Sequence, residues 1–328
     1  MNVLHPEPPN HVKSVIPGRG LHWAALFAAA LTWPLLISGG EVTTYKVGMA
    51  VPDWPTTFNE NMFLYDFWNA SYGVFKEHLH RLFGATLGLM AIVLAVWAYC
   101  TDPRRWMKAV GIGALLAVCL QGVLGGLRVT RNSTSLASFH ACTGQAVFAL
   151  LVAVAVWTGP RWWNAAKPVP DDGQIRRASS FVLGLIYLQI VLGAWVRHFP
   201  SAVSAIAHLC SAFCVLAGVF RLNWRIERNR ETYSSLVGAA RMMGAILLIQ
   251  MTLGLLAFWI LLPFDGTVSP VQTAQAMIRT GHQANGALLL ATGVVLALRA
   301  IRGFDPATTI YKELNEAKET RSELEAIF

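Results

Sequence analysis

Eight apolar stretches, each long enough to cross a lipid bilayer, dominate this sequence. They cover approximately residues 21–38, 78–100, 106–127, 138–158, 178–197, 203–221, 239–262 and 281–299. A membrane-spanning helix needs about 20 mostly apolar residues, because its backbone polar groups must be satisfied within the segment. Only 13% of the residues are charged and 55% are hydrophobic, whereas about a quarter of a soluble domain is charged. The sequence therefore predicts an all-α integral membrane protein with eight transmembrane helices.

The distribution of basic residues predicts the orientation of these helices. If the N-terminus is cytoplasmic, only seven of the 26 Lys and Arg residues fall in outer segments: Lys46, Lys76, Arg81, Arg128, Arg131, Arg197 and Arg279. Basic residues accumulate on the cytoplasmic side of membrane proteins, so we predict an N-in, C-in topology. The net charge of +8 then indicates attraction to anionic membrane lipid. The sequence has no basic stripe with interleaved aromatic residues, so we expect no nucleic-acid partner.

The N-terminal segment and the cysteines indicate the cellular compartment. The first twenty residues lack an apolar core before a small-residue cleavage site, so they predict neither a signal peptide nor a transit peptide. We therefore expect a multi-pass protein of a bacterial plasma (inner) membrane. The five cysteines show no CxxC spacing and lie within predicted spans, where we interpret them as small buried apolar residues.

A histidine recurs near the start of every second predicted helix. The four segments read HRLFG from His80, HACTG from His140, HLCSA from His208 and HQANG from His282. Residues i and i+4 share one face of a helix, so each imidazole has a Gly or Ala one turn deeper. In the predicted topology, all four histidines lie at a similar depth near the outer face.

A second repeat occupies the helices between them. The segments LQGVLGG, LQIVLGA and IQMTLGL share the pattern Gln-x-x-Leu-Gly, at residues 121–125, 189–193 and 250–254. Small residues allow the close approach of a helix or of a flat ligand, and helix packing alone would also account for this pattern. The two repeats together predict two pseudo-symmetric four-helix bundles in the same orientation, which is a parallel repeat.

These repeats define the predicted domain organisation. The segments are a cytoplasmic N-terminal segment 1–20, an N-terminal bundle 21–160 with an outer loop 39–76, a cytoplasmic linker 161–177, a C-terminal bundle 178–300 and a cytoplasmic tail 301–328.

Paired histidines in a helix bundle indicate a haem site. Two imidazoles that face each other across a bundle can ligate one haem iron, and the natural pairs are His80 with His140 and His208 with His282. A lone histidine in a helix is more typically a packed polar residue, but four at one depth favour ligands. Zinc would need a third or fourth protein ligand, and a proton relay would spread through the membrane.

Arginines near the outer ends of the intervening helices are candidate anchors for haem propionates. These are Arg128, Arg131 and Arg197, and a guanidinium suits bidentate binding of a carboxylate. Ordinary snorkelling of basic side chains to the interface would explain the same residues.

The two halves differ beside the first histidine. Aligned on their histidines, Glu77 falls opposite Ala205, and Arg81 falls opposite Leu209. Glu77 and His80 are three residues apart and share a helix face. A carboxylate in a membrane is costly unless it is paired or functional. Glu77 therefore forms an ion pair with Arg81 or takes part in chemistry that only the first half performs.

The motif EHLHR, the four histidines, the Gln-x-x-Leu-Gly helices and the stretch GGEVTTYKVGMAVPDWP resemble those of the haem A synthase family. The resemblance implies that His208 and His282 hold a haem b cofactor and that His80 and His140 mark the site of haem O. It implies that Glu77 is the catalytic residue and that the C8 methyl of haem O is oxidised to a formyl group, which makes haem A for terminal oxidases. The partners it implies are a haem O synthase, an electron donor and further copies of the chain in a homo-oligomer.

The first outer loop departs from the family pattern. Where the family commonly has an Arg and a Thr-Gly-Ser-Gly-Leu stretch, this chain has TTYKVGMA, and its outer loops lack the cysteine pair of some bacterial members. The aromatic, Pro-rich stretch 49–68 is suited to cover the site and exclude water. Its aromatic residues Trp54, Phe58, Phe63, Phe67 and Trp68 are equally typical of an interfacial belt.

Two other functions compete with haem A synthesis. A non-catalytic di-haem b-type cytochrome that transfers electrons would explain the four histidines but not Glu77. A transporter is disfavoured because the helices with histidines carry no midplane charges and none of the spans is broken.

Overall fold

The computed structural model describes residues 19–165, 168–171, 173–261 and 272–305. In these residues, eight long helices are apolar enough to cross a membrane. They are α1 (Arg19–Thr44), α2 (Tyr72–Thr101), α3 (Arg105–Thr130), α4 (Thr134–Thr158), α6 (Gln174–His198), α7 (Ala202–Arg228), α8 (Ser234–Leu261) and α9 (Thr273–Gly303). The remaining elements are the short helix α5 (Pro160–Trp163) and the strands β1 (Val169–Pro170) and β2 (Phe304–Asp305), which pair in parallel. The prediction of an all-helical, multi-pass membrane protein is confirmed.

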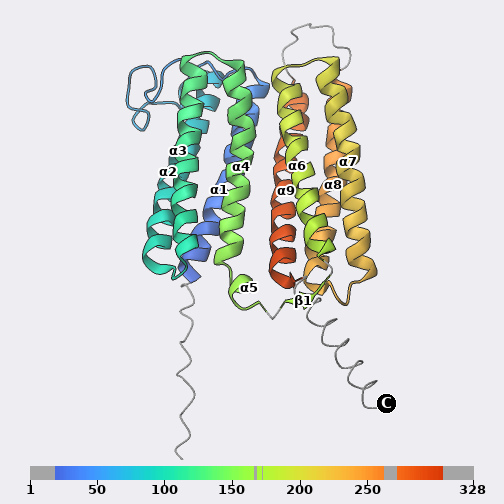
Figure 1. Cartoon of the computed structure of the whole chain (residues 1–328). Helices are drawn as coiled ribbons and strands as arrows, with labels where there is room; N and C mark the ends of the chain where they lie inside the picture. Colours follow the sequence, from blue (N-terminus) through green and yellow to red (C-terminus); the bar gives the residue numbers. More distant parts are fainter. Residues whose placement is uncertain (1–18, 166–167, 172, 262–271, 306–328) are drawn as a thin grey trace, which may run out of the picture.

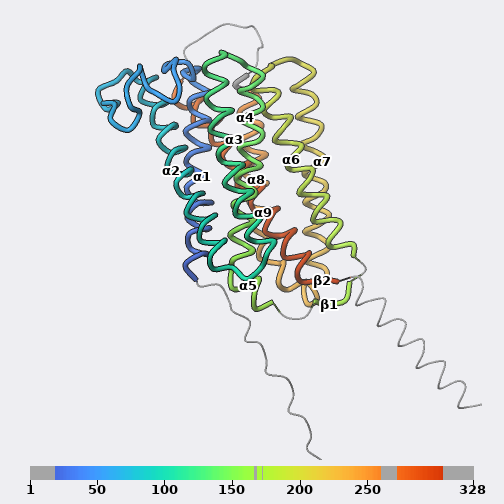
Figure 2. The backbone as a smooth tube through the Cα atoms, turned by 60° about the vertical axis from the view of Figure 1, so that its left-hand side comes forward, coloured from blue at the N-terminus to red at the C-terminus, as the bar shows by residue number. Residues whose placement is uncertain are grey.

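The helices pack in two groups of four (Figures 1 and 2). In the first group α1 contacts α2 and α4, and α3 contacts the same two helices. In the second group α6 contacts α7 and α9, and α8 contacts the same two helices. The groups meet where α9 packs against α1 and α4, and where α4 packs against α6. The pseudo-symmetry of the two groups stays a prediction.

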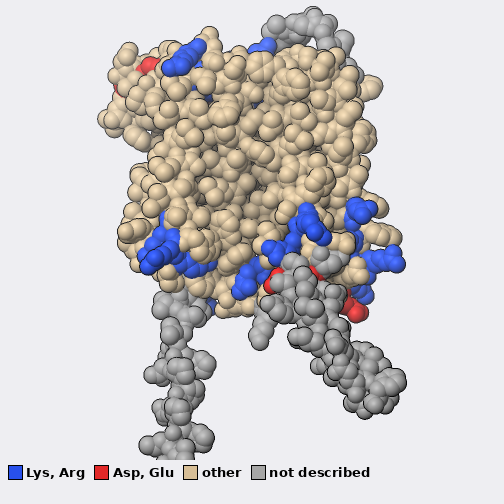
Figure 3. Space-filling view, in the orientation of Figure 1, with Lys and Arg blue, Asp and Glu red and all other residues tan. Residues whose placement is uncertain are grey.

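The described chain starts and ends at the same end of the molecule. Figure 1 shows the start of α1 and the end of α9 at the lower end of the view. On the face drawn in Figure 3, Lys and Arg side chains gather at this end. Most of the predicted cytoplasmic termini, residues 1–18 and 306–328, lie outside the described residues. The N-in, C-in orientation stays a prediction.

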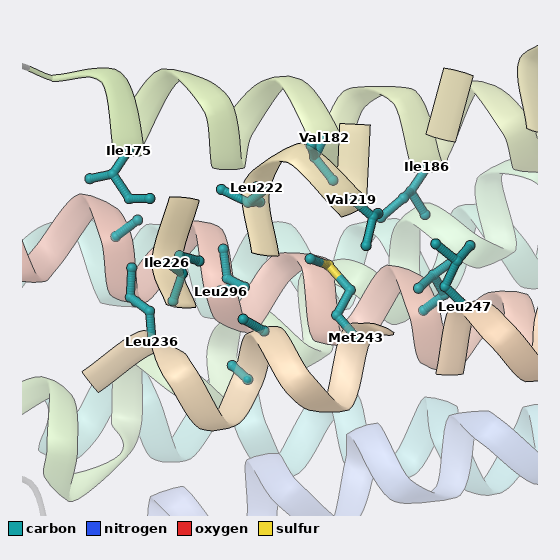
Figure 4. Packing of buried hydrophobic residues seen from close by; sticks show 14 of the residues in the cluster. Ile175, Val182, Ile186, Val219, Leu222, Ile226, Leu236, Met243, Leu247 and Leu296 are labelled. Carbon is teal, nitrogen blue, oxygen red and sulfur yellow. The ribbon is translucent and has the colours of Figure 1, made fainter. Parts of the chain in front are cut away.

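Each group has its own apolar core. The first contains Leu94, Met107 and Leu151, which are at most 2% exposed. The second extends from Ile175 to Leu296 and fills the space between α6, α7, α8 and α9 (Figure 4). Burial of such side chains stabilises each group, and it holds the helix faces that carry the histidines in fixed register.

The cysteines do not belong to these cores. All five are free thiols, and four of them are exposed: Cys100, Cys119, Cys210 and Cys214. The interpretation of these four as buried residues is wrong. They lie on outer helix surfaces, where lipid is as apolar as a protein core and a thiol incurs little cost.

The outer loop is shorter than predicted. Helix α1 continues to Thr44 and α2 begins at Tyr72, so the loop spans residues 45–71 instead of 39–76. The helix passes through Gly39 and Gly40 because other side chains pack there: an added Cβ would lie 2.9 Å from Cε1 of His80 or from Oε1 of Gln283, respectively. Since α2 starts at Tyr72, Glu77 lies more than one turn inside the helix, whereas the predicted window began one residue after it, at 78.

Candidate functional site

Each predicted ligand histidine rests against a glycine of the preceding helix. In the first half, an added Cβ would lie 2.9 Å from Cε1 of His80 at Gly39 and 3.2 Å from Cε1 of His140 at Gly125. In the second half, it would lie 3.0 Å from Cε1 of His208 at Gly193 and 2.9 Å from Cε1 of His282 at Gly254. A larger residue would push the ring away. The glycine of the Gln-x-x-Leu-Gly motif therefore leaves the space in which the imidazole of the next helix packs; we call such a glycine the seat of that histidine. Sequence reasoning missed Gly39, which has no glutamine four residues before it.

The second-half pair has the spacing of two ligands to one metal. The ring centroids of His208 and His282 are 6.2 Å apart and the rings are nearly perpendicular, at 85°. A metal–imidazole bond is about 2 Å long, which places the centroids of two rings that share a metal about 6 Å apart. This spacing fits a haem iron between the two rings.

The glutamines of the Gln-x-x-Leu-Gly motif lie beside the ring nitrogens of the second-half histidines. Nε2 of Gln189 lies 3.3 Å from Nε2 of His208, and Nε2 of Gln250 lies 3.4 Å from Nε2 of His282. Which group donates in each pair depends on the histidine tautomer. Each glutamine thus contacts a polar edge of the imidazole that the next helix presents.

The first-half pair has an unequal environment. Nδ1 of His80 lies 2.9 Å from Oγ of Ser38, whereas Nδ1 of His140 is buried without a hydrogen-bond partner, as it is in the second-half pair. In the described part of the chain, no three His, Cys, Asp or Glu side chains form a group that could hold a metal ion, so the largest available ligand set is a pair.

The small residue one turn after each histidine has different neighbours in different helices. An added Cβ at Gly84 would meet nothing within 4 Å, whereas the nearest atom to one at Gly144 or Gly286 belongs to Gln121 or Gln250. The space beside Gly84 fits the expected room for a macrocycle. The other two glycines admit the glutamine side chains.

Glu77 and Arg81 form a buried ion pair. Their side chains are 1% and 9% exposed, and Arg81 Nη2 donates to Glu77 Oε1 over 3.0 Å. The other carboxylate oxygen accepts from the backbone N–H of Val51 over 2.9 Å. The pairing that the sequence left open is therefore present. Both oxygens of Glu77 are held in place, and its catalytic role stays a prediction.

The same guanidinium binds the outer loop. Arg81 donates to the carbonyl oxygens of Val51, Asp53 and Thr56 over 2.8, 2.7 and 3.0 Å. A planar guanidinium presents five donors in a fixed fork, which suits it to gather three carbonyls. One side chain of α2 thus fixes the path of residues 51–56.

Asp53 organises the turn that follows. Its carboxylate accepts from the hydroxyl of Thr56 and from the backbone N–H groups of Phe58 and Asn59. Burial alone would raise the pKa of Asp53, but these hydrogen bonds outweigh it and lower the pKa to about 2. The positive φ of Phe58 and Asn59 shows how tightly the chain turns here.

His78 anchors the loop. It is 0% exposed, its Nδ1 lies 3.1 Å from Oγ1 of Thr57, and its ring stacks on Phe67 at a centroid distance of 4.8 Å. His78 is enclosed because residues of the outer loop fold over it. The sequence carried no signal for this long-range contact.

Arg128 is the best placed of the predicted propionate anchors. It has no hydrogen bond or ion pair within the described residues, and it lies about one helical turn after Gly125, the glycine against which His140 rests. It also touches the loop, since an added Cβ at Gly48 would lie 2.7 Å from its Nη1. A guanidinium with free donors beside a histidine pair is suited to bind a ligand carboxylate. The second candidate, Arg131, is exposed at the end of α3.

Arg197, the third candidate, ties the two groups of helices together. It donates to Oε1 of Gln283 over 2.7 Å, to the carbonyl of Gly40 over 2.6 Å and to the hydroxyl of Thr44.

Comparisons with known proteins agree with this arrangement. The COX15-CtaA family, described as cytochrome oxidase assembly proteins, matches residues 62–205. The haem A synthase of Symbiobacterium thermophilum is 29% identical over 224 residues, which cover 59% of this chain and 67% of the relative. That of Halalkalibacterium halodurans is 27% identical over 177 residues, 52% of this chain and 57% of the relative. That of Caulobacter vibrioides is 23% identical over 339 residues, 84% of this chain and 94% of the relative.

This chain is similar to haem A synthases over these matched regions. The resemblance of its motifs is thereby confirmed. The family match covers Glu77, His80, Arg81 and His140 and stops before His208. Its alignments with the first two relatives span 67% and 57% of their lengths.

Proposed function

We propose that this protein is a haem A synthase that oxidises the C8 methyl of haem O to a formyl group. The observation that carries this proposal is the asymmetry between the halves. Both have a histidine pair seated on glycines, but only the first has a buried carboxylate, Glu77, one helical turn from a ligand histidine. A carboxylate buried at that place is expected to serve chemistry as well as structure.

The two histidine pairs take different haems. His208 and His282 hold haem b as the cofactor, which their centroid distance of 6.2 Å supports. His80 and His140 bind the substrate haem O, with Arg128 as the propionate anchor. When bound, haem iron supplies the redox chemistry. Ser38 and Gly39 orient the ring of His80, and this fixes the macrocycle relative to Glu77.

Glu77 acts on the reacting methyl as a fixed anion. Arg81 and the N–H of Val51 hold its two oxygens, so it needs no reorganisation during the reaction. It either stabilises positive charge that develops at the methyl carbon or accepts the proton lost from it. Residues 51–57, bound over the end of α2, exclude water from this chemistry.

The proposed setting is a bacterial plasma membrane with the Lys- and Arg-rich end of Figure 3 in the cytoplasm. The proposed partners are a haem O synthase that supplies the substrate, an electron donor and further copies of the chain. The apolar outer surfaces of the helices are suited to contact membrane lipid and a farnesyl tail.

Co-expression of the full-length protein with a source of haem O, followed by mass analysis of the extracted haems, tests this proposal. The native chain should yield haem A. Glu77→Gln keeps the size of the side chain and should abolish haem A while haem b remains bound, and His208→Ala should reduce haem b. Haem A at native levels in Glu77→Gln would refute the role of Glu77. An extract of native protein with only haem O and haem B would favour a di-haem b-type cytochrome.

A further inference from the structure

Trp54 in the outer loop lies against α3 at Gly126, the residue that follows the glycine against which His140 rests. An added Cβ at Gly126 would lie 2.3 Å from Cδ2 and 2.5 Å from Cε3 of Trp54, so the indole occupies the space that any larger residue would fill. The preceding residue, Gly125, is the seat of His140. The Trp54 side chain is 41% exposed, so part of the ring is free to contact a ligand.

The backbone on both sides of Trp54 is held by α2. Arg81 binds the carbonyls of Asp53 and Thr56, which flank the tryptophan, and Glu77 binds the N–H of Val51. Hydrogen bonds to charged groups are about twice as strong as neutral ones. Trp54 is therefore placed by the same two side chains that distinguish the first half from the second.

Among the described residues, the connection between the first two helices of the second half has no equivalent of this loop. Helix α6 ends at His198 and α7 begins at Ala202, so only residues 199–201 connect them, where 27 residues, 45–71, connect α1 and α2. In the part of the chain that the structure describes, an aromatic wall and a buried carboxylate thus occur together in the half proposed to bind the substrate. Arg128, which touches Gly48 of the loop, adds a cation to the aromatic surface, a combination that suits a flat apolar ring with carboxylates.

We propose that Trp54 forms one wall of the site around His80 and His140 and contacts the tetrapyrrole bound there. Arg81 is a positioning residue that holds Trp54 in place. This inference rests on the proposed binding of a tetrapyrrole in the first half, and it assigns a substrate contact to a residue outside the histidine pairs. The loop fixes the macrocycle from the outer side while the histidines fix its iron.

The test is a haem titration of the isolated first-half site. In purified full-length protein, the double substitution His208→Ala/His282→Ala removes the second-half site and serves as the reference. Ferric haem B is the probe, and its Soret absorbance reports binding. Trp54→Ala should weaken binding about tenfold, as expected for the loss of one aromatic contact. Trp54→Phe keeps an aromatic ring and should weaken it less than about threefold.

Gly126→Ala provides an independent variant, because the added methyl displaces the indole while Trp54 itself remains. It should weaken binding about as much as Trp54→Ala, and the two substitutions combined should weaken it no more than Trp54→Ala alone. The matched control is Trp54→Ala in a His80→Ala/His140→Ala background, in which the second-half site should bind the probe with native affinity.

Three results of these titrations would overturn the proposal. Unchanged affinity in Trp54→Ala overturns the assignment of Trp54 but leaves the proposed function intact. Equal losses at both sites in Trp54→Ala also overturn it, because they indicate a general effect on the fold. Absence of binding in the reference protein overturns the first-half haem site itself, and the inference with it.

Discussion

Replacement of Arg81 by lysine should release the outer loop while a positive charge remains beside Glu77. The guanidinium makes three hydrogen bonds to carbonyl oxygens of residues 51–56 and one to the carboxylate. A lysine ammonium is a compact point charge that cannot reproduce the planar fork. If it keeps the ion pair and one carbonyl, two charged hydrogen bonds are lost.

The size of the effect follows from these contacts. A hydrogen bond to a charged group contributes about 1.5–3 kcal/mol, and the side chain of Arg81 is only 9% exposed, so solvent screens it little. The two lost bonds should therefore favour loop opening by at least about 3 kcal/mol, which corresponds to a roughly hundredfold larger open population.

Hydrogen exchange of full-length protein in detergent measures this population. Peptides that cover residues 48–62 contain the backbone N–H groups of Val51, Phe58 and Asn59, which are all hydrogen-bonded. Their exchange should accelerate by about two orders of magnitude if local opening controls it. The matched control is Arg241→Lys, which alters an exposed ion pair with Glu227 and should leave the loop unchanged. Exchange within twofold of native in Arg81→Lys would refute the role assigned to this side chain.

Three further predictions concern a glycine that packs against a histidine, the turn at Asp53 and the contact between the two groups of helices. Gly193→Ala places a methyl 3.0 Å from Cε1 of His208 and should reduce the low-spin haem spectrum, whereas Gly184→Ala, in open space on the same helix, should not. Because the pKa of Asp53 is lowered from 3.8 to about 2, its turn should be fully stabilised above about pH 4. Its protection factor, which corrects for the intrinsic exchange rate at each pH, should fall as pH falls toward 2, and Asp53→Asn should remove this pH dependence. Arg197→Ala should lower the free energy of unfolding by about 3 kcal/mol, measured by thermal denaturation against Arg241→Ala.

The sequence predicted the helices because their signal is local. Hydrophobicity and length placed all eight long helices, and every predicted window lies within one of them or runs only a residue beyond its described end. The ends were less accurate, because they depend on contacts from elsewhere in the chain. Gly39 and Gly40 stay helical only because His80 and Gln283 pack against them.

The candidate site was predictable where the chain repeats itself. Comparison of α2, α4, α7 and α9 with one another found the four histidines. Comparison of α3, α6 and α8 found three of the four glycines against which the histidines pack. Glu77 and Arg81 stood out because the second half lacks them, whereas contacts made by the outer loop were missed. His78, Thr57 and Trp54 make contacts across the outer loop, and nothing in residues 45–71 indicated which part would meet α2 or α3.

Consecutive residues of the EHLHR segment perform different tasks because a helix turns about 100° per residue. Glu77 and Arg81 share one face and hold the loop at Val51, whereas His78 points to another side, where Thr57 and Phe67 cover it. His80 faces α1 and meets Ser38. Since all four side chains leave one rigid helical turn, a shift of the loop's anchor must also shift the ring of His80. The position of the loop and the geometry at the proposed iron ligand are therefore mechanically coupled, and a loop variant should alter the haem spectrum of the first-half site as well as its affinity.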